Sequence, residues 1–195
     1  KKNALGKNWL LGETIITGRG QGYIQTTPSQ LCLMTAQIAN GGHKIYPQII
    51  LDDEIKNQPN DKFIPLYQNS KNIRIVQDAM FGSTNEVMGT SYRSRINDPK
   101  YQFAGKTGTA QVKRITEKQR ELDLKTFEIP YEERDHALYV AFGPYKNPRY
   151  ALSVVVEHGG NGSTTAAPMA KKLFKLIIDR HSLRESINDK QYMDI

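Results

Sequence analysis

Residues 103–112 read FAGKTGTAQV, a strand-like run in which one ionisable side chain stands among small residues and hydroxyls. A glycine before Lys106 and another two residues after it leave room for the backbone of a bound peptide to approach this strand and extend its sheet. Lys106, Thr107 and Thr109 could then donate hydrogen bonds to a carboxylate and to an oxyanion. The run therefore predicts a strand that recognises an anionic peptide.

A phosphate-binding loop is the first alternative, because residues 105–107, Gly-Lys-Thr, match the end of the GxxxxGK[ST] pattern. The leading glycine of that pattern would fall at position 100, which is Lys100, and the residues after Lys106 continue as a strand rather than as a helix. We therefore reject nucleotide binding. For these three residues alone, a lysine that protects an exposed sheet edge from aggregation stays open as an alternative.

The composition is that of a globular domain, because 38% of the 195 residues are hydrophobic and 24% are charged. We find no run of about 18 apolar residues and no signal-peptide pattern, so we expect no membrane span or targeting segment within this stretch. The net charge of +7 favours acidic partners without choosing among them. Lysines and arginines are dispersed among acidic residues, which argues against nucleic-acid binding.

The sequence gives little support for a metal site or for a catalytic histidine. The single cysteine, Cys32, excludes an internal disulfide and any site with several cysteine ligands, and it lies in an apolar run where packing is the expected role. His136 and His158 lie at expected strand ends without a second ligand at metal-binding spacing, so we expect structural hydrogen bonds from both. We predict neither a metal nor a cofactor.

A helix is predicted to begin at Pro28, because proline favours the first helical position. Thr27 can accept a hydrogen bond from the backbone of Gln30, and the Gln30 side chain can accept one in return, which completes a capping box. Residues 40–42, Asn-Gly-Gly, end the helix by supplying left-handed backbone positions. Because this helix is apolar on nearly all sides, we expect it to lie inside a domain.

Two further helices follow from the spacing of apolar residues. One begins near Lys71 and ends near Gly82 or a few residues later. The other begins between residues 163 and 166, because Pro168 is tolerated only in a first turn. Its apolar stripe should pack across the sheet.

Residues 137–142 and 150–156 flank a turn-rich segment and predict an antiparallel hairpin, which should join the lysine-bearing strand in one antiparallel sheet. Residues 45–51 predict a short strand or an extended piece, and Pro47 restricts it to an edge of the sheet. Residues 1–24 are rich in glycine and are expected to form a loop. Residues 114–135 predict a long connection, either a solvated loop or a flexible flap.

Residues 106–111, KTGTAQ, resemble the third active-site box of the penicillin-recognising serine transpeptidases. The flanking chain resembles the class B penicillin-binding proteins, most of all those of the penicillin-binding protein 2 type. The other matching segments, in the order of that family, are GQGY at 20–23, TPSQL at 27–31, ANGG at 39–42, HALYVAF at 136–142, VEHG at 156–159 and AAP at 166–168. Several matches in order are far more specific than a single box.

The resemblance implies an α+β fold of the penicillin-binding protein and serine β-lactamase type, an antiparallel sheet packed by helices. It also implies a peptidoglycan D,D-transpeptidase that cross-links stem peptides through a serine acyl-enzyme and binds penicillin. Lys106 would hold charge near the active serine. Thr107, Gly108 and Thr109 would bind substrate, with the two hydroxyls on its terminal carboxylate and the Thr109 amide N–H as half of the oxyanion hole.

The expected setting of the parent protein also comes from the resemblance. It implies stem peptides and β-lactam antibiotics as ligands, and a membrane glycosyltransferase of the elongation machinery as a partner. The parent would be anchored in a bacterial cytoplasmic membrane with this domain on the periplasmic side.

Two boxes of that family are not found where they belong. No serine is followed by a lysine three residues on, so the nucleophile box is absent from residues 1–195. Ser-x-Asn triplets begin at Ser70, Ser83 and Ser186, but the family's second box precedes the GQGY segment, so we reject all three. We expect residues 1–195 to be the C-terminal part of one transpeptidase domain. A non-catalytic module of the same fold that binds peptidoglycan or a partner is the alternative.

Overall fold

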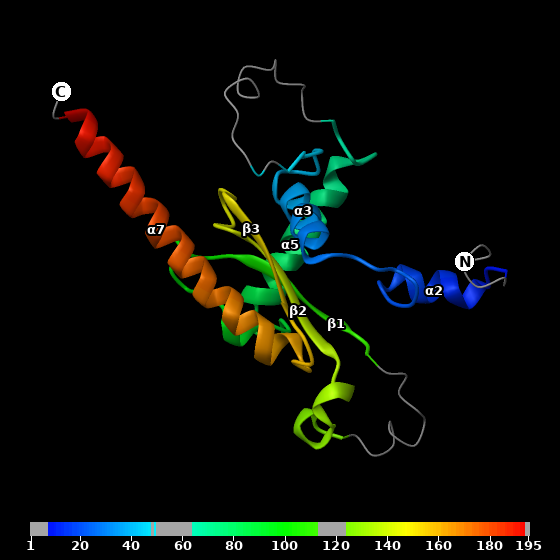
Figure 1. The fold of residues 1–195 in the computed structure, drawn as a ribbon. Coiled ribbons are helices and arrows are strands. Elements are labelled where there is room, and N and C mark those ends of the chain that lie inside the picture. Colours follow the sequence, from blue (N-terminus) through cyan, green and yellow to red (C-terminus); the bar gives the residue numbers. More distant parts are fainter. Residues whose placement is uncertain (1–7, 48, 50–63, 113–123, 194–195) are drawn as a thin grey trace.

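One antiparallel sheet organises the computed structural model, which describes residues 8–47, 49, 64–112 and 124–193, with side chains as far as Ser182. Its strands are β1 (Ala104–Ala110), β2 (His136–Gly143) and β3 (Tyr150–Val156), in the order β1-β2-β3 (Figure 1). Both strand pairs are antiparallel. The predicted α+β fold, the hairpin and the place of the lysine-bearing strand beside it are confirmed.

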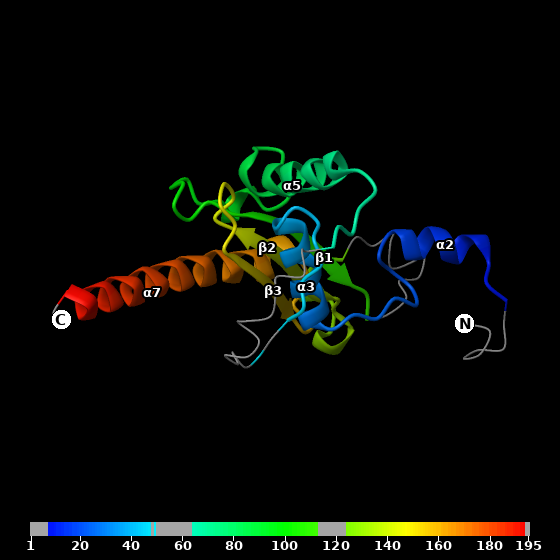
Figure 2. The same cartoon turned by 90° about the horizontal axis from the view of Figure 1, so that it is seen from above.

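The C-terminal helix α7 (Ala167–Met193) covers one face of the sheet and continues beyond it (Figures 1 and 2). Phe174 of this helix stacks on Phe103 with ring centroids 4.9 Å apart, and Phe103 meets Tyr139 edge-on. All three rings are fully buried among alanines of the sheet and the helix. A five-residue π-helical turn, Gly162–Ala166, precedes α7, so the helix begins where Pro168 predicts.

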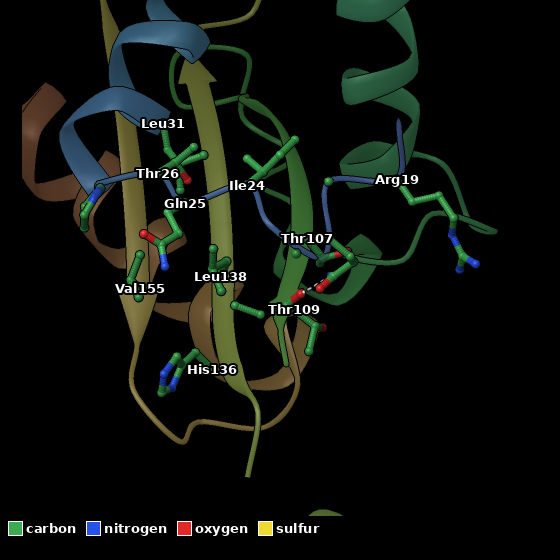
Figure 3. Close-up of a pocket in the computed structure, with 15 residues that line it drawn as sticks. Arg19, Ile24, Gln25, Thr26, Leu31, Thr107, Thr109, His136, Leu138 and Val155 are labelled. Carbon is green, nitrogen blue, oxygen red and sulfur yellow. Dashed lines mark hydrogen bonds between the residues drawn. The ribbon is translucent and has the colours of Figure 1, made fainter. Parts of the chain in front are cut away.

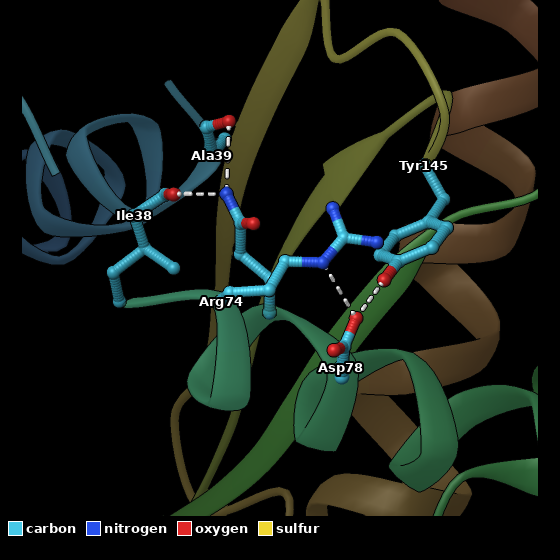
Figure 4. Close-up of polar contacts among 6 residues, drawn as sticks. Ile38, Ala39, Arg74, Asp78 and Tyr145 are labelled. Atoms are coloured by element: carbon cyan, nitrogen blue, oxygen red, sulfur yellow. Dashed lines mark hydrogen bonds and ion pairs between the residues drawn. The ribbon is translucent and has the colours of Figure 1, made fainter. Parts of the chain in front are cut away.

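Helices α3 (Pro28–Ala39) and α5 (Ser70–Asn85) pack on the opposite face of the sheet. Met80 of α5 is buried there against Ala104 and Phe142. The Gln77 amide donates to the carbonyl of Ile38 at 2.7 Å and so holds the end of α3 against α5 (Figure 4).

The same figure shows a polar clamp at the turn between β2 and β3. Asp78 accepts a hydrogen bond from the hydroxyl of Tyr145, which lies in that turn, and pairs with Arg74 one helical turn earlier at 3.2 Å. The clamp joins α5 to the hairpin from a solvent-exposed side of the helix, since the side chains of Arg74 and Asp78 are 66% and 54% exposed.

The capping pattern of α3 is confirmed in detail. The backbone N–H of Gln30 donates to Thr27 Oγ1 at 3.2 Å, and the backbone N–H of Thr27 donates to Gln30 Oε1 at 2.8 Å. Gly41 and Gly42 follow the helix with φ of 90° and 88°, as the left-handed prediction requires. The prediction that α3 lies inside a domain is not met by the described residues, because Thr35 is the one residue of this helix that they bury.

The loop predicted over residues 1–24 is wrong in one part. Residues Leu11–Gly18 form helix α2, which has no buried residue and extends away from the sheet (Figure 1). Glu13 stabilises its first turn by accepting the backbone N–H of Leu10 at 2.7 Å, and Trp9 Nε1 donates to Thr14 Oγ1 at 2.8 Å. These local bonds outweigh the glycines that favoured a loop.

Of the short strand or extended piece predicted for residues 45–51, residues 45–47 do not form a strand, and most of the remainder lies outside the described residues. The pairing occurs earlier, as an isolated bridge between His43 and Pro65. Of the long connection 114–135, residues 124–135 contain two short 3-10 turns, and the preceding part lies outside the described residues.

Candidate active site

Among the described strands, β1 lies at an edge of the sheet and carries the predicted site residues. The Lys106 side chain is exposed, and its Nζ donates to the Thr107 carbonyl at 2.8 Å and to Thr107 Oγ1 at 3.3 Å. The structure therefore brings an ammonium group and a hydroxyl together at the strand edge. Both can donate to an incoming carboxylate.

Thr109 lies two residues further along the same strand and is also exposed. Its backbone carbonyl accepts a hydrogen bond from the Gln21 side chain at 2.7 Å. Gln21 is 88 residues away in sequence, so this bond holds the N-terminal segment against the end of β1. Gly108 lies between the two threonines, where an added Cβ would come 3.3 Å from Leu138 Cβ.

The backbone around Lys106 is fixed from behind by a buried hydroxyl cluster. Tyr139 Oη lies 2.9 Å from Thr84 Oγ1 and 3.1 Å from Ser91 Oγ, and Thr84 Oγ1 is 3.4 Å from the carbonyl of Gly105. Burial raises the pKa of Tyr139, so its hydroxyl stays protonated and can donate within the cluster. The packing of the interior explains why residue 105 is a glycine, because the Tyr139 ring occupies the space that a side chain at this position would need.

A groove of about 600 Å³ runs between the N-terminal segment and the sheet (Figure 3). Apolar side chains from the segment and from the sheet line it, and the hydroxyl-bearing residues of β1 stand at its side. Its lining residues are Arg19, Gly20, Gln21, Ile24, Gln25, Thr26, Pro28, Leu31, Thr107, Gly108, Thr109, Ala110, His136, Leu138 and Val155. Lys106 is not in this lining, so the groove lies beside Thr107 and Thr109 and not beside the lysine.

The two histidines make the structural hydrogen bonds that the sequence predicts. The backbone N–H of His158 donates to His136 Nδ1 at 2.9 Å, and His158 Nδ1 lies 3.1 Å from the carbonyl of Arg134. Their rings meet edge-on with centroids 4.8 Å apart. His136 also lines the groove, a position that the sequence does not reveal.

Two further side chains, those of Asn85 and Cys32, have structural roles, as the sequence predicts for Cys32. Asn85, at the end of α5, donates to the carbonyls of Phe81 at 3.0 Å and Phe103 at 2.9 Å, which is a structural role. Cys32 Sγ donates to the carbonyl of Ala151 at 3.4 Å, and burial raises the pKa of this thiol, which suits packing rather than nucleophilic chemistry.

In the part of the chain that the structure describes, no group of three or more histidine, cysteine or carboxylate side chains could hold a metal ion. Over the same residues, no helix has both the length and the apolar character needed to cross a bilayer.

Sequence reasoning missed two groups at the site, Gln21 and the Gly-Thr-Ser turn at residues 89–91. The signal for Gln21 was its place in the GQGY segment, and for the turn it was a cluster of small polar residues just after a predicted helix. Neither signal indicates which strand the residues contact.

The fold is that of a penicillin-binding protein transpeptidase domain, and comparison with known proteins agrees. The family profile described as "Penicillin binding protein transpeptidase domain" matches residues 1–175, and the chain belongs to this family. Within it, the chain is of the class B type that includes penicillin-binding protein 2, also named MrdA.

Curated relatives include the peptidoglycan D,D-transpeptidases MrdA of Salmonella typhimurium and Escherichia coli. The first is 34% identical over 184 residues, which cover 89% of this chain and 28% of the relative. The second is 29% identical over 198 residues, which cover 97% of this chain and 29% of the relative. The chain thus spans less than a third of the length of these relatives.

Two solved structures are similar to the fold. A complex between penicillin-binding protein 2 and MreC from Helicobacter pylori superposes with a TM-score of 0.74 at 29% identity, covering 92% of this chain and 30% of that one. Pseudomonas aeruginosa penicillin-binding protein 2 in complex with WCK 5153 gives a TM-score of 0.71 at 34% identity, covering 90% of this chain and 36% of that one.

Proposed function

We propose that this chain is the C-terminal part of the catalytic domain of a peptidoglycan D,D-transpeptidase, which cross-links stem peptides through a serine acyl-enzyme and is acylated by β-lactams. The observation that carries the proposal is the edge strand β1, where the Lys106 ammonium lies 3.3 Å from the Thr107 hydroxyl. An extended peptide can add to such an edge through its backbone. The curated relatives are peptidoglycan D,D-transpeptidases.

In this proposal the serine nucleophile lies in a part of the protein outside residues 1–195, since the chain has no Ser-x-x-Lys box. The serine oxygen attacks the carbonyl carbon of the penultimate D-alanine, and the terminal D-alanine leaves with a proton on its amine. The amine of a second stem peptide then attacks the ester and releases the serine. Two easier steps replace one difficult amide exchange.

Each site residue has a role in this sequence of steps. Lys106 supplies positive charge near the serine and favours its deprotonation. The hydroxyls of Thr107 and Thr109 bind the terminal carboxylate, and Gly108 keeps the strand between them accessible. The amide N–H of Thr109 donates to the developing oxyanion.

The parent protein is proposed to act on the periplasmic side of a bacterial cytoplasmic membrane to which it is anchored. A membrane glycosyltransferase is the proposed partner, by resemblance. The Helicobacter pylori relative was solved with MreC, so a second candidate partner of that kind belongs in any co-purification test.

The test is Lys106→Ala in the full-length protein, with acylation by a fluorescent penicillin as the readout. We expect the acylation rate to fall by about a hundredfold or more, in the range seen when a transition-state donor is removed. The fold should persist, because the side chain is exposed. Lys172→Ala, an equal charge change at an exposed position on α7, is the matched control and should be acylated normally.

Near-normal acylation of the Lys106→Ala protein would sink the assignment of this strand. A wild-type full-length protein that takes no penicillin would instead favour the alternative, a non-catalytic module that binds peptidoglycan or a partner.

A further inference from the structure

The turn that follows α5 brings a hydroxyl to the site from outside β1. The backbone N–H of Ser91 donates to the carbonyl of Ser83 at 3.0 Å, and the Ser91 hydroxyl donates to the same oxygen. Gly89 lies so close to the helix end that an added Cβ would come 2.5 Å from the carbonyl oxygen of Gly82. The residues on both sides of Thr90 are thus packed against α5.

Thr90 itself projects toward β1. Its Oγ1 lies 3.2 Å from Ser83 Oγ and 3.4 Å from Thr107 Oγ1. On its other side, Thr107 Oγ1 lies 3.3 Å from Lys106 Nζ. The three hydroxyls and the ammonium therefore form one continuous chain of polar contacts that ends at the strand edge.

We propose that Thr90 is a positioning residue for the substrate carboxylate, acting through the hydroxyl of Thr107. A hydroxyl has one proton and two lone pairs, and an ammonium group can only donate. When Lys106 and Thr90 both donate to Thr107 Oγ1, the two lone pairs are occupied and the Thr107 proton points away from the protein toward a carboxylate. The inference rests on the proposed function.

The direction of donation follows from the next hydroxyl in the chain. Ser83 can donate to Thr90 Oγ1, which favours the Thr90 proton pointing to Thr107, since hydrogen bonds in a chain reinforce one another. In the opposite direction Thr107 would donate its proton to Thr90, and this proton could then form no hydrogen bond with the carboxylate. Thr90 thus selects the orientation of Thr107 that binds an anion.

The position of Thr90 allows this role to be separated from folding. Its side chain is exposed, so replacing the hydroxyl by a methyl group leaves no buried polar atom without a partner. The packing of the turn depends on Gly89 and Ser91, which stay in place. We expect Thr90→Val to keep the melting temperature of the wild type within about 2 °C, the usual range for a surface substitution.

The experiment uses the full-length protein in its wild-type, Thr90→Val and Thr90→Ser forms. Second-order acylation constants are measured for benzylpenicillin, which has a free carboxylate, and for its methyl ester, which has none. For the free acid, Thr90→Val should lower the constant by about fivefold, the typical worth of one hydrogen bond, and Thr90→Ser should restore it to within about twofold. For the ester, all three proteins should react equally.

The ester arm distinguishes positioning from a general structural effect, because a disturbed strand would slow both compounds alike. Equal losses on acid and ester, or no loss on the acid, would overturn the inference while leaving the proposed function intact. A wild-type protein that neither compound acylates would refute both. If Thr90→Val lowers the melting temperature, Thr90→Ala provides the same comparison without the branched side chain.

Discussion

The aromatic ring of Tyr139 occupies the space that a side chain at Gly105 would need. A Cβ added at position 105 would lie 2.5 Å from Cζ of this ring, and real Cβ atoms do not approach so closely. Tyr139 is fully buried, with its hydroxyl bonded to Thr84 and Ser91, so it has no free space to withdraw into. The glycine before Lys106 is therefore required by the interior of the protein.

Gly105→Ala should accordingly destabilise the fold. Overpacking of this kind typically lowers the free energy of unfolding by about 1–3 kcal/mol. Gly108→Ala is the matched control on the same strand, because its Cβ would come 3.3 Å from Leu138 Cβ and needs only a small adjustment. Denaturant titration of both variants measures the difference, and equal losses would show that the ring does not restrict position 105.

The hydroxyl of Tyr139 should contribute to stability in its own right. Tyr139→Phe removes its hydrogen bonds to Thr84 and Ser91, although both partners keep a backbone carbonyl acceptor. We expect the free energy of unfolding to fall by about 1 kcal/mol at neutral pH, the usual net worth of such bonds.

The same variant tests the effect of pH. Burial raises the pKa of Tyr139 above its ordinary value of about 10, so at higher pH the unfolded chain loses this proton while the folded chain keeps it. The contribution of the Tyr139 hydroxyl to the free energy of unfolding is complete below about pH 10, and it is lost as the pH rises through the pKa of Tyr139 in the folded protein. Tyr139→Phe should lose less stability above pH 10 than the wild type, and parallel pH profiles would contradict this.

Local signals in the sequence predicted the parts of the fold that local chemistry determines. The cap of α3 needs only Thr27 and Gln30, three residues apart, and both bonds form. The hairpin follows from two apolar runs around a turn. Helix α2 was missed because its stabilising contacts, such as the one from Glu13 to the backbone of Leu10, compete with two glycines whose effect could not be weighed from sequence.

Only part of the candidate site could be predicted from the sequence, and the reason differs from that for α2. The residues of β1 are contiguous, so their chemistry can be seen in the sequence. The contacts that Gln21 makes with Thr109 and Thr90 makes with Thr107 join segments 88 and 17 residues apart. Which turn meets which strand depends on how α5 and the N-terminal segment pack on the sheet, and no local pattern encodes that.

Residues 1–195 alone should form no acyl-enzyme with a fluorescent penicillin. Acylation needs a serine hydroxyl activated by a nearby base, and no serine in this chain has the family's lysine three residues on. Intact mass spectrometry after incubation with the drug measures the outcome, with the full-length protein as the positive control. A stoichiometric covalent adduct on the 195-residue chain would overturn the proposal that the nucleophile lies elsewhere.

The last prediction concerns apolar surface around α3. Met34 of this helix is 43% exposed, and Val155 on the adjoining sheet is 37% exposed. Apolar groups on a helix that packs against a sheet are normally covered, and exposed patches of more than a few hundred Å² mark interfaces or sites of aggregation. We expect the remainder of the transpeptidase domain to cover this surface in the full-length protein.

The 195-residue chain should therefore bind a hydrophobic dye or self-associate at concentrations where the full-length protein stays monomeric. Met34→Lys places a charge on the exposed part of α3 and should reduce dye binding. Lys172→Met, which adds an apolar side chain on the distant helix α7, is the control for a general change in surface polarity and should not reduce it. Light scattering that shows a monomer, together with no dye binding, would mean that these residues close their own core and need no further part of the domain.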